Sequence, residues 1–139
     1  MPRCALAPLR RAWPALLTAG ALATLALPPA VRAEPRPFPA TALRAEFAVE
    51  LPPQVRLDGR SARLAPGARI RGADNLIVVP AALAGQEPVT VHYTVDTYGL
   101  LRDVWVLTAE ERALKPWPRT PAEAAAWRYD PLARRWSKP

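Results

Sequence analysis

The sequence is 139 residues long, which is enough for a single domain, and it carries 18 prolines and a formal net charge of +7. So many prolines exclude a chain that is mostly helical or built from long uninterrupted strands, because proline lacks the backbone N–H that both structures use. The positive charge suggests an anionic partner, but part of it lies in the N-terminal segment described next.

The first 33 residues have the three parts of a secretory signal peptide. A start with three arginines precedes a short apolar stretch at residues 13–27, and Val31-Arg32-Ala33 then offers small residues for cleavage before Glu34. The apolar stretch is shorter than the roughly 20 residues needed to span a bilayer, so we expect cleavage, with retention as an anchor as the alternative. The chain is therefore predicted to be exported to the periplasm, with secretion or attachment to the envelope as alternatives.

Cleavage would lower the charge and remove the single cysteine. Residues 1–33 hold four of the 19 basic residues and no acidic residue, so the mature chain keeps 15 basic and 12 acidic residues and a charge of +3. That charge is ordinary for a protein surface, so nucleic acid is not expected as a partner. Loss of Cys4 excludes a disulfide, a thiolate nucleophile and a cysteine metal ligand from the mature chain.

Composition divides the rest of the chain into four parts. Residues 34–43 are rich in proline and are predicted to form an extended, poorly ordered lead-in. Residues 44–108 are expected to form a small β domain, and residues 109–128 to form one or two short helices. Residues 129–139 form a basic-aromatic tail without periodicity, which we expect to be mobile.

The β domain is expected to start with a strand and a tight hairpin. In residues 44–51, apolar residues such as Phe47 and Val49 alternate with others, as in a half-buried strand. Asp58-Gly59 then stands between two alternating segments and predicts a two-residue type I′ turn, which pairs Leu57 with Arg60.

Three further strands are expected in the middle of the β domain. Pro66-Gly67 predicts a turn before a short strand at residues 68–71, and a second turn leads to the β-branched run at residues 76–79. After a connection with room for one helical turn comes the clearest strand, residues 89–95. In this strand the valines and Tyr93 alternate with polar residues.

Residues 96–99, Asp-Thr-Tyr-Gly, are typical of a type I turn that continues into a glycine bulge. In that register Tyr93 faces Asp103. The residues of the second strand placed in the core are then Leu101, Trp105 and Leu107. The residues placed outward are His92, Thr94, Arg102 and Val104. A four-residue loop would instead place Val104 and Val106 inside, and we prefer the first register because its outer face is more polar.

Capping residues predict two short helices after the sheet. Thr108 and Glu111 form a capping box, and Thr120-Pro121 with Glu123 repeats the pattern. Short strands with turns about every 8–12 residues favour a mainly β fold. We therefore predict a small barrel or sandwich of about six short antiparallel strands, followed by one or two short C-terminal helices.

Few residues have the pattern of a catalytic or metal site. His92 is the single histidine, and with Asp103 it could form an acid–base pair, so a hydrolytic enzyme is the weaker of two alternative functions. A metal site needs three or four ligands, and neither serine stands in a nucleophile motif. No catalytic residue, metal or cofactor is therefore predicted.

The C-terminal region interleaves aromatic and basic residues, a composition that can bind a membrane surface or a polymer. The candidate binding surface consists of Trp117, Arg119, Trp127, Arg128, Tyr129, Arg134, Arg135 and Trp136. The structural interpretation is that the tryptophans pack against the sheet while the arginines stay in water. We predict a non-catalytic binding or adaptor domain of the cell envelope; the first alternative is a protein held at the membrane or a cell-wall polymer by this tail. The expected partner is another envelope protein or an anionic envelope surface.

The segments LAPGARIRG, DNLIVV and DVWVLTAEE, together with the hairpin pattern Y-T-x-D-x-x-G, lie within residues 63–111. They resemble a group of small uncharacterised exported proteins from GC-rich Gram-negative bacteria. The resemblance implies export and a compact β unit, and no activity is attached to that group. The chain is also similar, in strand count and glycine turns, to small exported barrels of the oligonucleotide/oligosaccharide-binding type.

Overall fold

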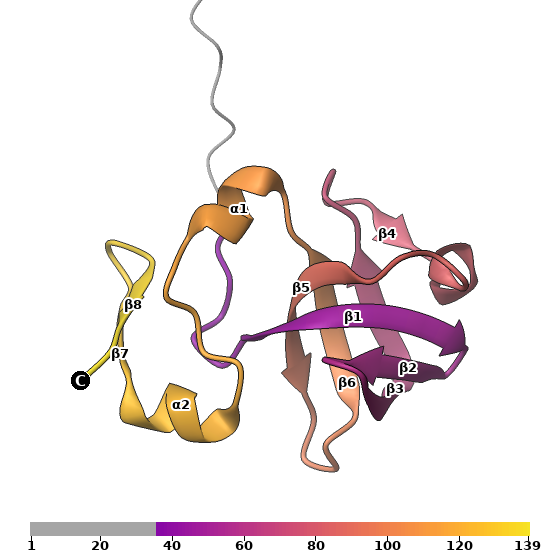
Figure 1. The fold of residues 1–139 in the computed structure, drawn as a ribbon, viewed down its shortest axis with the longest axis horizontal. Helices are drawn as coiled ribbons and strands as arrows, with labels where there is room; N and C mark the ends of the chain where they lie inside the picture. The colour runs from indigo at the N-terminus through magenta and orange to yellow at the C-terminus, as the bar shows by residue number, and fades with distance from the viewer. Residues whose placement is uncertain (1–35) are drawn as a thin grey trace, which may run out of the picture. The chain divides into compact units, whose positions relative to one another are not determined.

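The structure, a computed structural model, describes residues 36–139, so the predicted signal peptide and its cleavage site lie outside the described residues. The strands of the main sheet are β1 (Leu43–Leu51), β2 (Gln54–Leu57), β3 (Arg60–Arg71), β4 (Ile77–Val78), β5 (Val89–Val95) and β6 (Leu101–Val106). The other elements are the 3₁₀ helix η1 (Pro80–Leu83), the helices α1 (Ala109–Ala113) and α2 (Pro121–Ala126), and the strands β7 (Arg128–Asp130) and β8 (Arg135–Ser137). Figure 1 shows this mainly β fold.

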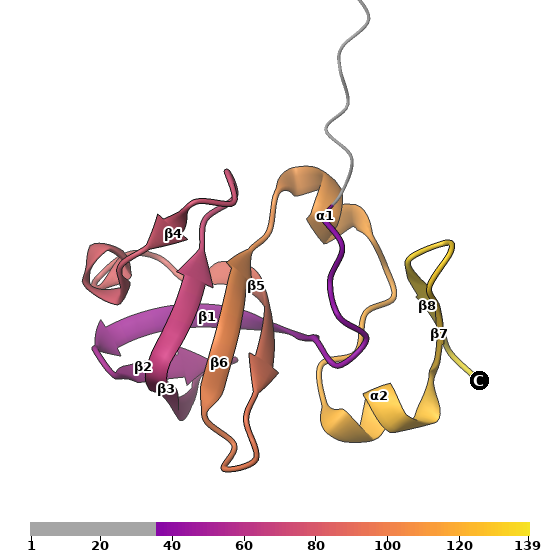
Figure 2. The same cartoon turned by 180° about the vertical axis from the view of Figure 1, so that it is seen from behind.

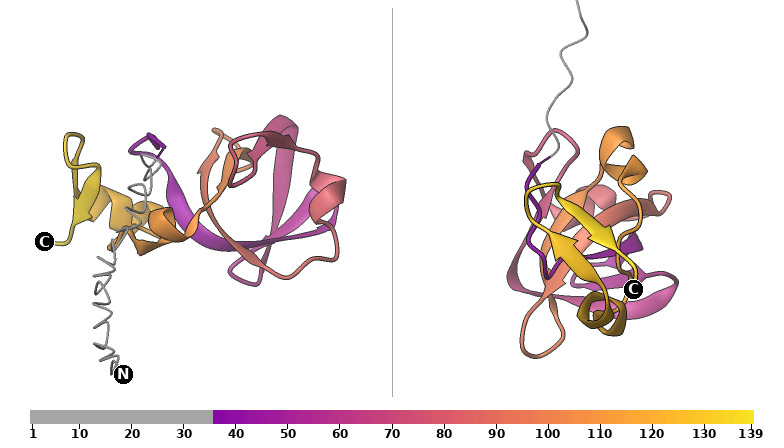
Figure 3. Two further views of the ribbon diagram at one scale, coloured as in Figure 1. Left: turned by 90° about the horizontal axis from the view of Figure 1, so that it is seen from above. Right: turned by 90° about the vertical axis from the view of Figure 1, so that its left-hand side faces the viewer.

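The six strands form one curled sheet in the order β2-β1-β5-β6-β3-β4, and β2 also pairs with β3. The pairing of β3 with β6 is interrupted between Leu64 and Arg69, so the ring of strands is not fully closed. Its two halves pack on one core, as in a small sandwich, and the strands curve about this interior (Figures 2 and 3). The predicted fold class is confirmed, although β3 and β6 run parallel and make the sheet mixed.

The first hairpin forms as predicted. Asp58 and Gly59 have φ angles of 49° and 78°, both positive as a type I′ turn requires, and Leu57 pairs with Arg60. The strand side chains that point inward from this hairpin and from the rest of the sheet form an apolar core. Its buried residues are Leu43, Ala45, Phe47, Val49, Val55, Leu64, Ile70, Val91, Tyr93, Leu101 and Val104.

β3 continues through Pro66-Gly67, where the sequence predicted a turn. Gly67 has a φ of +76° and lies in the irregular stretch between Leu64 and Arg69, which is out of register with β6. Glycine adopts this backbone without strain, and proline cannot donate to a neighbouring strand. These residues therefore distort the strand without ending it.

The register between β5 and β6 differs from the preferred prediction. The turn itself is the expected one: the N–H of Asp96 donates to the carbonyl of Leu100 at 2.9 Å, and Gly99 has a φ of +77°. An extra residue, Arg102, then bulges from β6, so that Val95 pairs with Leu101 whereas Thr94 pairs with Asp103. Every later residue of β6 consequently faces the side opposite to the one we preferred.

The bulge buries Val104 and turns Trp105 outward beside His92. Tyr93 pairs with Val104, which is fully buried, and His92 pairs with Trp105. The alternative prediction assigned the correct face to Val104, although a bulge produces it and not a longer loop. The physical reason is the spacing of apolar residues: Val104 is out of phase with Leu101, so only an extra residue places both on the core face.

A second layer covers the outer face of β1 and β5. Residues 36–42 were predicted to be poorly ordered, but Phe38 is buried and the carbonyl of Ala42 accepts a bond from the indole N–H of Trp117 at 2.9 Å. The tail was predicted to be mobile, but it forms the β7–β8 hairpin and buries Trp136. Figure 1 shows α1, α2 and this hairpin on one side of the curled sheet, beside the start of β1. The buried residues of this second cluster are Phe38, Ala42, Leu107, Trp117 and Trp136.

One buried ion pair ties the N-terminal segment to α1. The capping box of Thr108 and Glu111 forms as predicted, and the Glu111 carboxylate also accepts bonds from the Nε and Nη2 of Arg36 at 2.8 and 2.7 Å. Burial alone would raise the pKa of Glu111, but hydrogen bonds from Arg36 and from the Thr108 N–H, with the charge of Arg36, hold that pKa below its usual value. α2 is capped by Thr120, also as predicted.

The register predicts different costs for the same substitution at two positions of the hairpin. Val104→Thr should lower the free energy of unfolding by about 1–3 kcal/mol, because it buries a hydroxyl in an apolar core. Val95→Thr is the matched control. Because Val95 is 44% exposed, this substitution should lower the free energy of unfolding by about 0.5 kcal/mol or less. Urea denaturation of both variants measures the difference, and equal losses would contradict the register.

The buried ion pair predicts acid-sensitive stability. Glu111→Gln should cost about 3–5 kcal/mol at neutral pH, because Arg36 loses its partner, whereas Glu50→Gln, in an exposed pair with Arg56, should cost about 1 kcal/mol or less. Since the folded pKa of Glu111 lies below the unfolded one, its contribution is complete above the unfolded pKa and is lost as the pH falls through the folded pKa. Unfolding measured between pH 7 and pH 3 should show a steeper loss for the wild type than for Glu111→Gln; parallel curves would refute the role of Glu111.

Candidate functional site

The outer face of β3 and β6 carries two adjoining hollows. On β3, Arg69 and Arg71 flank the buried Ile70 and point to the opposite face. On β6, the bulge places Arg102 and Asp103 together on the same outer face, since Leu101 and Val104 on either side are buried. The two parallel strands thus bring three arginines and one aspartate together.

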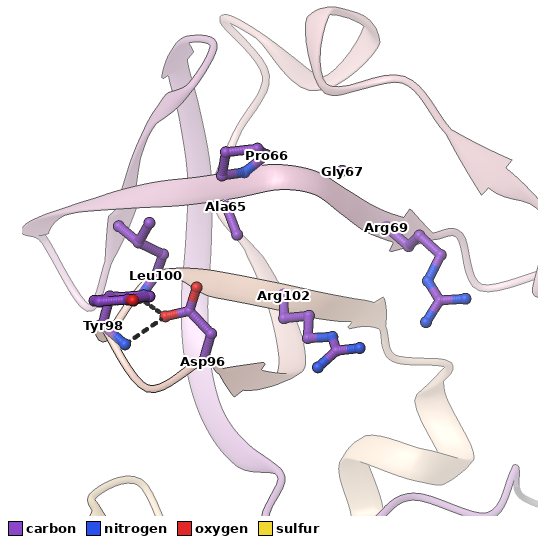
Figure 4. A pocket seen from close by; sticks show the side chains of 8 residues that line it. All are labelled: Ala65, Pro66, Gly67, Arg69, Asp96, Tyr98, Leu100 and Arg102. Carbon is purple, nitrogen blue, oxygen red and sulfur yellow. Dashed lines mark hydrogen bonds between the residues drawn. The ribbon is translucent and has the colours of Figure 1, made fainter.

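One hollow of about 730 Å³ lies between the distorted stretch of β3 and the β5–β6 turn. It is lined by Ala65, Pro66, Gly67, Arg69, Asp96, Tyr98, Leu100 and Arg102. In Figure 4, Tyr98, Leu100 and Asp96 lie at one end, while the guanidinium groups of Arg69 and Arg102 extend toward the other. The hollow exists because β3 and β6 are out of register at Ala65–Ala68.

A second hollow of about 500 Å³ continues along the same outer face. It shares Arg69 and Arg102 with the first and extends to Arg71, Asp103, Thr94 and Trp105, where Pro39 and Thr41 of the second layer border it. We call the two hollows together the β3–β6 groove. Tyr98 stands at one end of this groove and Trp105 at the other.

The turn holds Tyr98 in place at its end of the groove. One carboxylate oxygen of Asp96 accepts bonds from the backbone N–H groups of Tyr98 and Leu100 at 2.8 and 3.0 Å (Figure 4). These bonds fix the backbone of the loop, and the Tyr98 side chain is left 86% exposed. A large aromatic ring held so far into water is available for a ligand.

Charge in the groove is only partly compensated. The Nε of Arg69 forms an ion pair with the Asp103 carboxylate at 3.1 Å. The side chains of Arg71 and Arg102 form no hydrogen bond or ion pair with other residues between 36 and 139. The groove therefore offers two guanidinium groups whose donors are free for an anion.

The predicted acid–base pair of His92 and Asp103 is not brought together. His92 is completely buried, not on a wet face as predicted, because the second layer covers it. Its ring stacks on Trp117, with 4.0 Å between the ring centroids, and lies edge-on to Phe38, with 4.4 Å between the centroids. Its Nε2 accepts a bond from the Nε of Arg44 at 3.2 Å. Burial, then the charges of Arg44 and Arg36, lower the pKa of His92 to about 2, so the ring stays neutral.

Asp103 also lies elsewhere than predicted. We expected it beside Tyr93 on the inner face, but the bulge turns it to the outer face, where it pairs with Arg69. Among the residues that the structure describes, no group of three or more His, Cys, Asp or Glu side chains could hold a metal ion. None of the helices between residues 36 and 139 has the length and hydrophobicity of a transmembrane segment.

The C-terminal candidate surface separates into buried rings and exposed charges. Trp117 and Trp136 are buried, and Trp127 and Tyr129 are partly buried beside them. The exposed arginines are Arg119, Arg128 and Arg135, and Arg134 is partly buried. Arg119 forms an ion pair with Asp58. The set therefore presents arginines to solvent and keeps two of its three tryptophans in the core, as the structural interpretation predicts.

Sequence reasoning missed the β3–β6 groove because the groove depends on a parallel contact between distant strands. The alternation Ala-Arg-Ile-Arg at residues 68–71 already signals two outward arginines. The phase break between Leu101 and Val104 is the signal for the bulge that brings Arg102 beside them. Neither signal by itself indicates that β3 and β6 are neighbours.

Comparison with known proteins finds no match from which a function could be inferred. No protein-family model matches this chain. No curated protein and no solved structure matches it either.

Proposed function

We propose that this chain is an exported, non-catalytic binding domain of the cell envelope, and that the β3–β6 groove binds an extended anionic glycan. The observation that carries the proposal is the continuity of the groove: two hollows share Arg69 and Arg102 and run between two aromatic rings. A ligand that fits must therefore be long and must carry negative charge.

The chemistry of the lining favours acidic sugars. Arginine binds carboxylates through paired N–H donors, and Arg71 and Arg102 have donors to spare. The rings of Tyr98 and Trp105 offer apolar faces against which the C–H face of a sugar ring can pack. Threonine hydroxyls at Thr41 and Thr94 can bond to sugar hydroxyls.

Two features support binding without catalysis. The acids of the groove are already engaged, since Asp96 accepts backbone bonds within the turn and Asp103 pairs with Arg69. A hydrolytic role for His92 would need an imidazole that reaches substrate, whereas His92 is buried and neutral. The sheet supports the choice of ligand by an analogy of fold. Strands β1, β2, β3, β5 and β6 form an incompletely closed ring, which has the general form of the partly open barrels that bind oligosaccharides.

Envelope attachment through the C-terminal region is the second candidate function. Leu132, at the tip of the β7–β8 hairpin, is 95% exposed, and Arg128 and Arg135 on the two strands are exposed as well. An apolar tip with nearby cations suits an anionic membrane surface. If this candidate is right, Leu132→Ser should release the protein from anionic vesicles, and the β3–β6 groove should be dispensable for attachment.

The glycan proposal predicts charge-selective binding. Calorimetric titration should give saturable binding of a tetramer of galacturonic acid and no measurable binding of maltotetraose, which is neutral and of equal length. Arg71→Gln and Arg102→Gln should each weaken binding about tenfold, since each removes a charge that contacts the ligand. Arg63→Gln is the matched control, because Arg63 lies on the same strand, is exposed and lines neither hollow.

Three results would overturn the proposal. Equal affinity for the neutral and acidic tetramers would show that charge does not drive binding. An equal loss of affinity in Arg63→Gln and in the two groove variants would show that the ligand does not bind in the groove. Tighter binding of tetraglutamate than of the acidic sugar would replace the glycan with an acidic peptide.

A further inference from the structure

A separate cationic cup in the second layer contains a buried arginine. The cup has a volume of about 520 Å³ and shares no lining residue with the β3–β6 groove. Four of its lining residues are cationic and two are tryptophans: Arg44, Lys115, Arg119, Lys138, Trp117 and Trp127. We call it the Arg44 cup.

Arg44 has hydrogen-bond partners but no acidic partner. It lies on β1 and is 7% exposed. Its Nη1 and Nη2 donate to the carbonyls of Arg112 and Glu111 at 3.2 and 3.0 Å, and its Nε donates to the neutral ring of His92. Arg44 itself forms no ion pair with another residue between 36 and 139.

A buried cation with only neutral acceptors is costly, since it has left water without gaining an opposite charge. The carbonyls at the end of α1 offset part of this cost. Burial, followed by the nearby positive charge of Arg119, lowers the pKa of Arg44, which is the direction expected for a cation in an unfavourable field. A bound anion would relieve both effects.

The rest of the cup is also arranged for an anion. Its one acid, Glu123, is engaged: a carboxylate oxygen accepts a bond from the backbone N–H of Arg119 at 2.7 Å. At the rim, Lys115 is exposed, and the ammonium of Lys138 lies 5.1 Å from the ring of Trp127. The indole of Trp117, 5.7 Å from the Arg44 guanidinium, supplies an apolar wall.

We propose that the Arg44 cup binds a small organic anion, a carboxylate on an aromatic or other apolar body. The carboxylate meets Arg44, whose described bonds occupy three of five N–H groups. Lys115 and Lys138 attract the anion at the rim, and the apolar body lies against Trp117 and Trp127. This site is independent of the glycan groove, so either can fail without the other.

Benzoate is the probe, with benzamide as its neutral counterpart of the same shape. Calorimetry and thermal unfolding at fixed ionic strength should show saturable binding of benzoate and a rise in melting temperature. Benzamide should bind at least about tenfold more weakly, because it lacks the charge. Inorganic phosphate, an anion without an apolar body, should also bind more weakly than benzoate.

The variants avoid Arg44 because its loss could unfold the protein. The double substitution Lys115→Gln with Lys138→Gln changes two exposed rim residues and should weaken benzoate binding about tenfold. The matched control is Arg128→Gln with Arg135→Gln, which removes the same charge outside the cup and should change affinity less than about twofold. Arg71→Gln, in the other groove, should leave benzoate binding unchanged.

Each contrary result is decisive. Absence of saturable benzoate binding, or equal binding of benzamide, would overturn the anion site. Equal losses of benzoate affinity in the rim and control variants would show that benzoate binds outside the cup. Tighter binding of phosphate than of benzoate would show that the ligand needs no apolar body.

Discussion

The extra residue at Arg102 is the constraint on which the rest of this structure depends. Leu101 and Val104 must both reach the core, and a regular strand cannot place residues three apart on one face. The bulge resolves the conflict and also leaves Arg102 and Asp103 side by side on the outer face. The same local irregularity therefore sets the core and supplies Arg102 and Asp103 to the β3–β6 groove.

The bulge also contributes to the second layer, because it turns Trp105 to the face that this layer covers. It leaves Trp105 opposite His92 on the outer face of the hairpin, where large rings would otherwise meet water. Residues 36–42 and 115–118 cover His92, with Phe38 at the edge of its ring and Trp117 stacked on it. The ion pair of Arg36 with Glu111 fastens the first of these segments, and the second lines one part of the Arg44 cup. Covering one face thus adds apolar burial that a small core lacks.

Local chemistry was predictable from the sequence, and long-range pairing was not. Asp58-Gly59 and the two threonine caps depend on residues adjacent in sequence, and all three form as predicted. The bulge at Arg102 changes the register after a correctly predicted turn, because burial of Val104 outweighs the polar outer face that we preferred. The groove escaped prediction because it requires the parallel contact of β3 with β6, and the order of the tail escaped because Trp136 finds its partners in distant segments.

Nuclear Overhauser contacts across the β5–β6 hairpin test this account most directly, because the register determines both the core and the groove. The account predicts backbone contacts between Tyr93 and Val104 and between His92 and Trp105, with Arg102 unpaired between Leu101 and Asp103. It also predicts that probes dissolved in the solvent do not reach the Val104 methyl groups, since this side chain is fully buried. Contacts between Tyr93 and Asp103, with Val104 accessible to solvent, would contradict it.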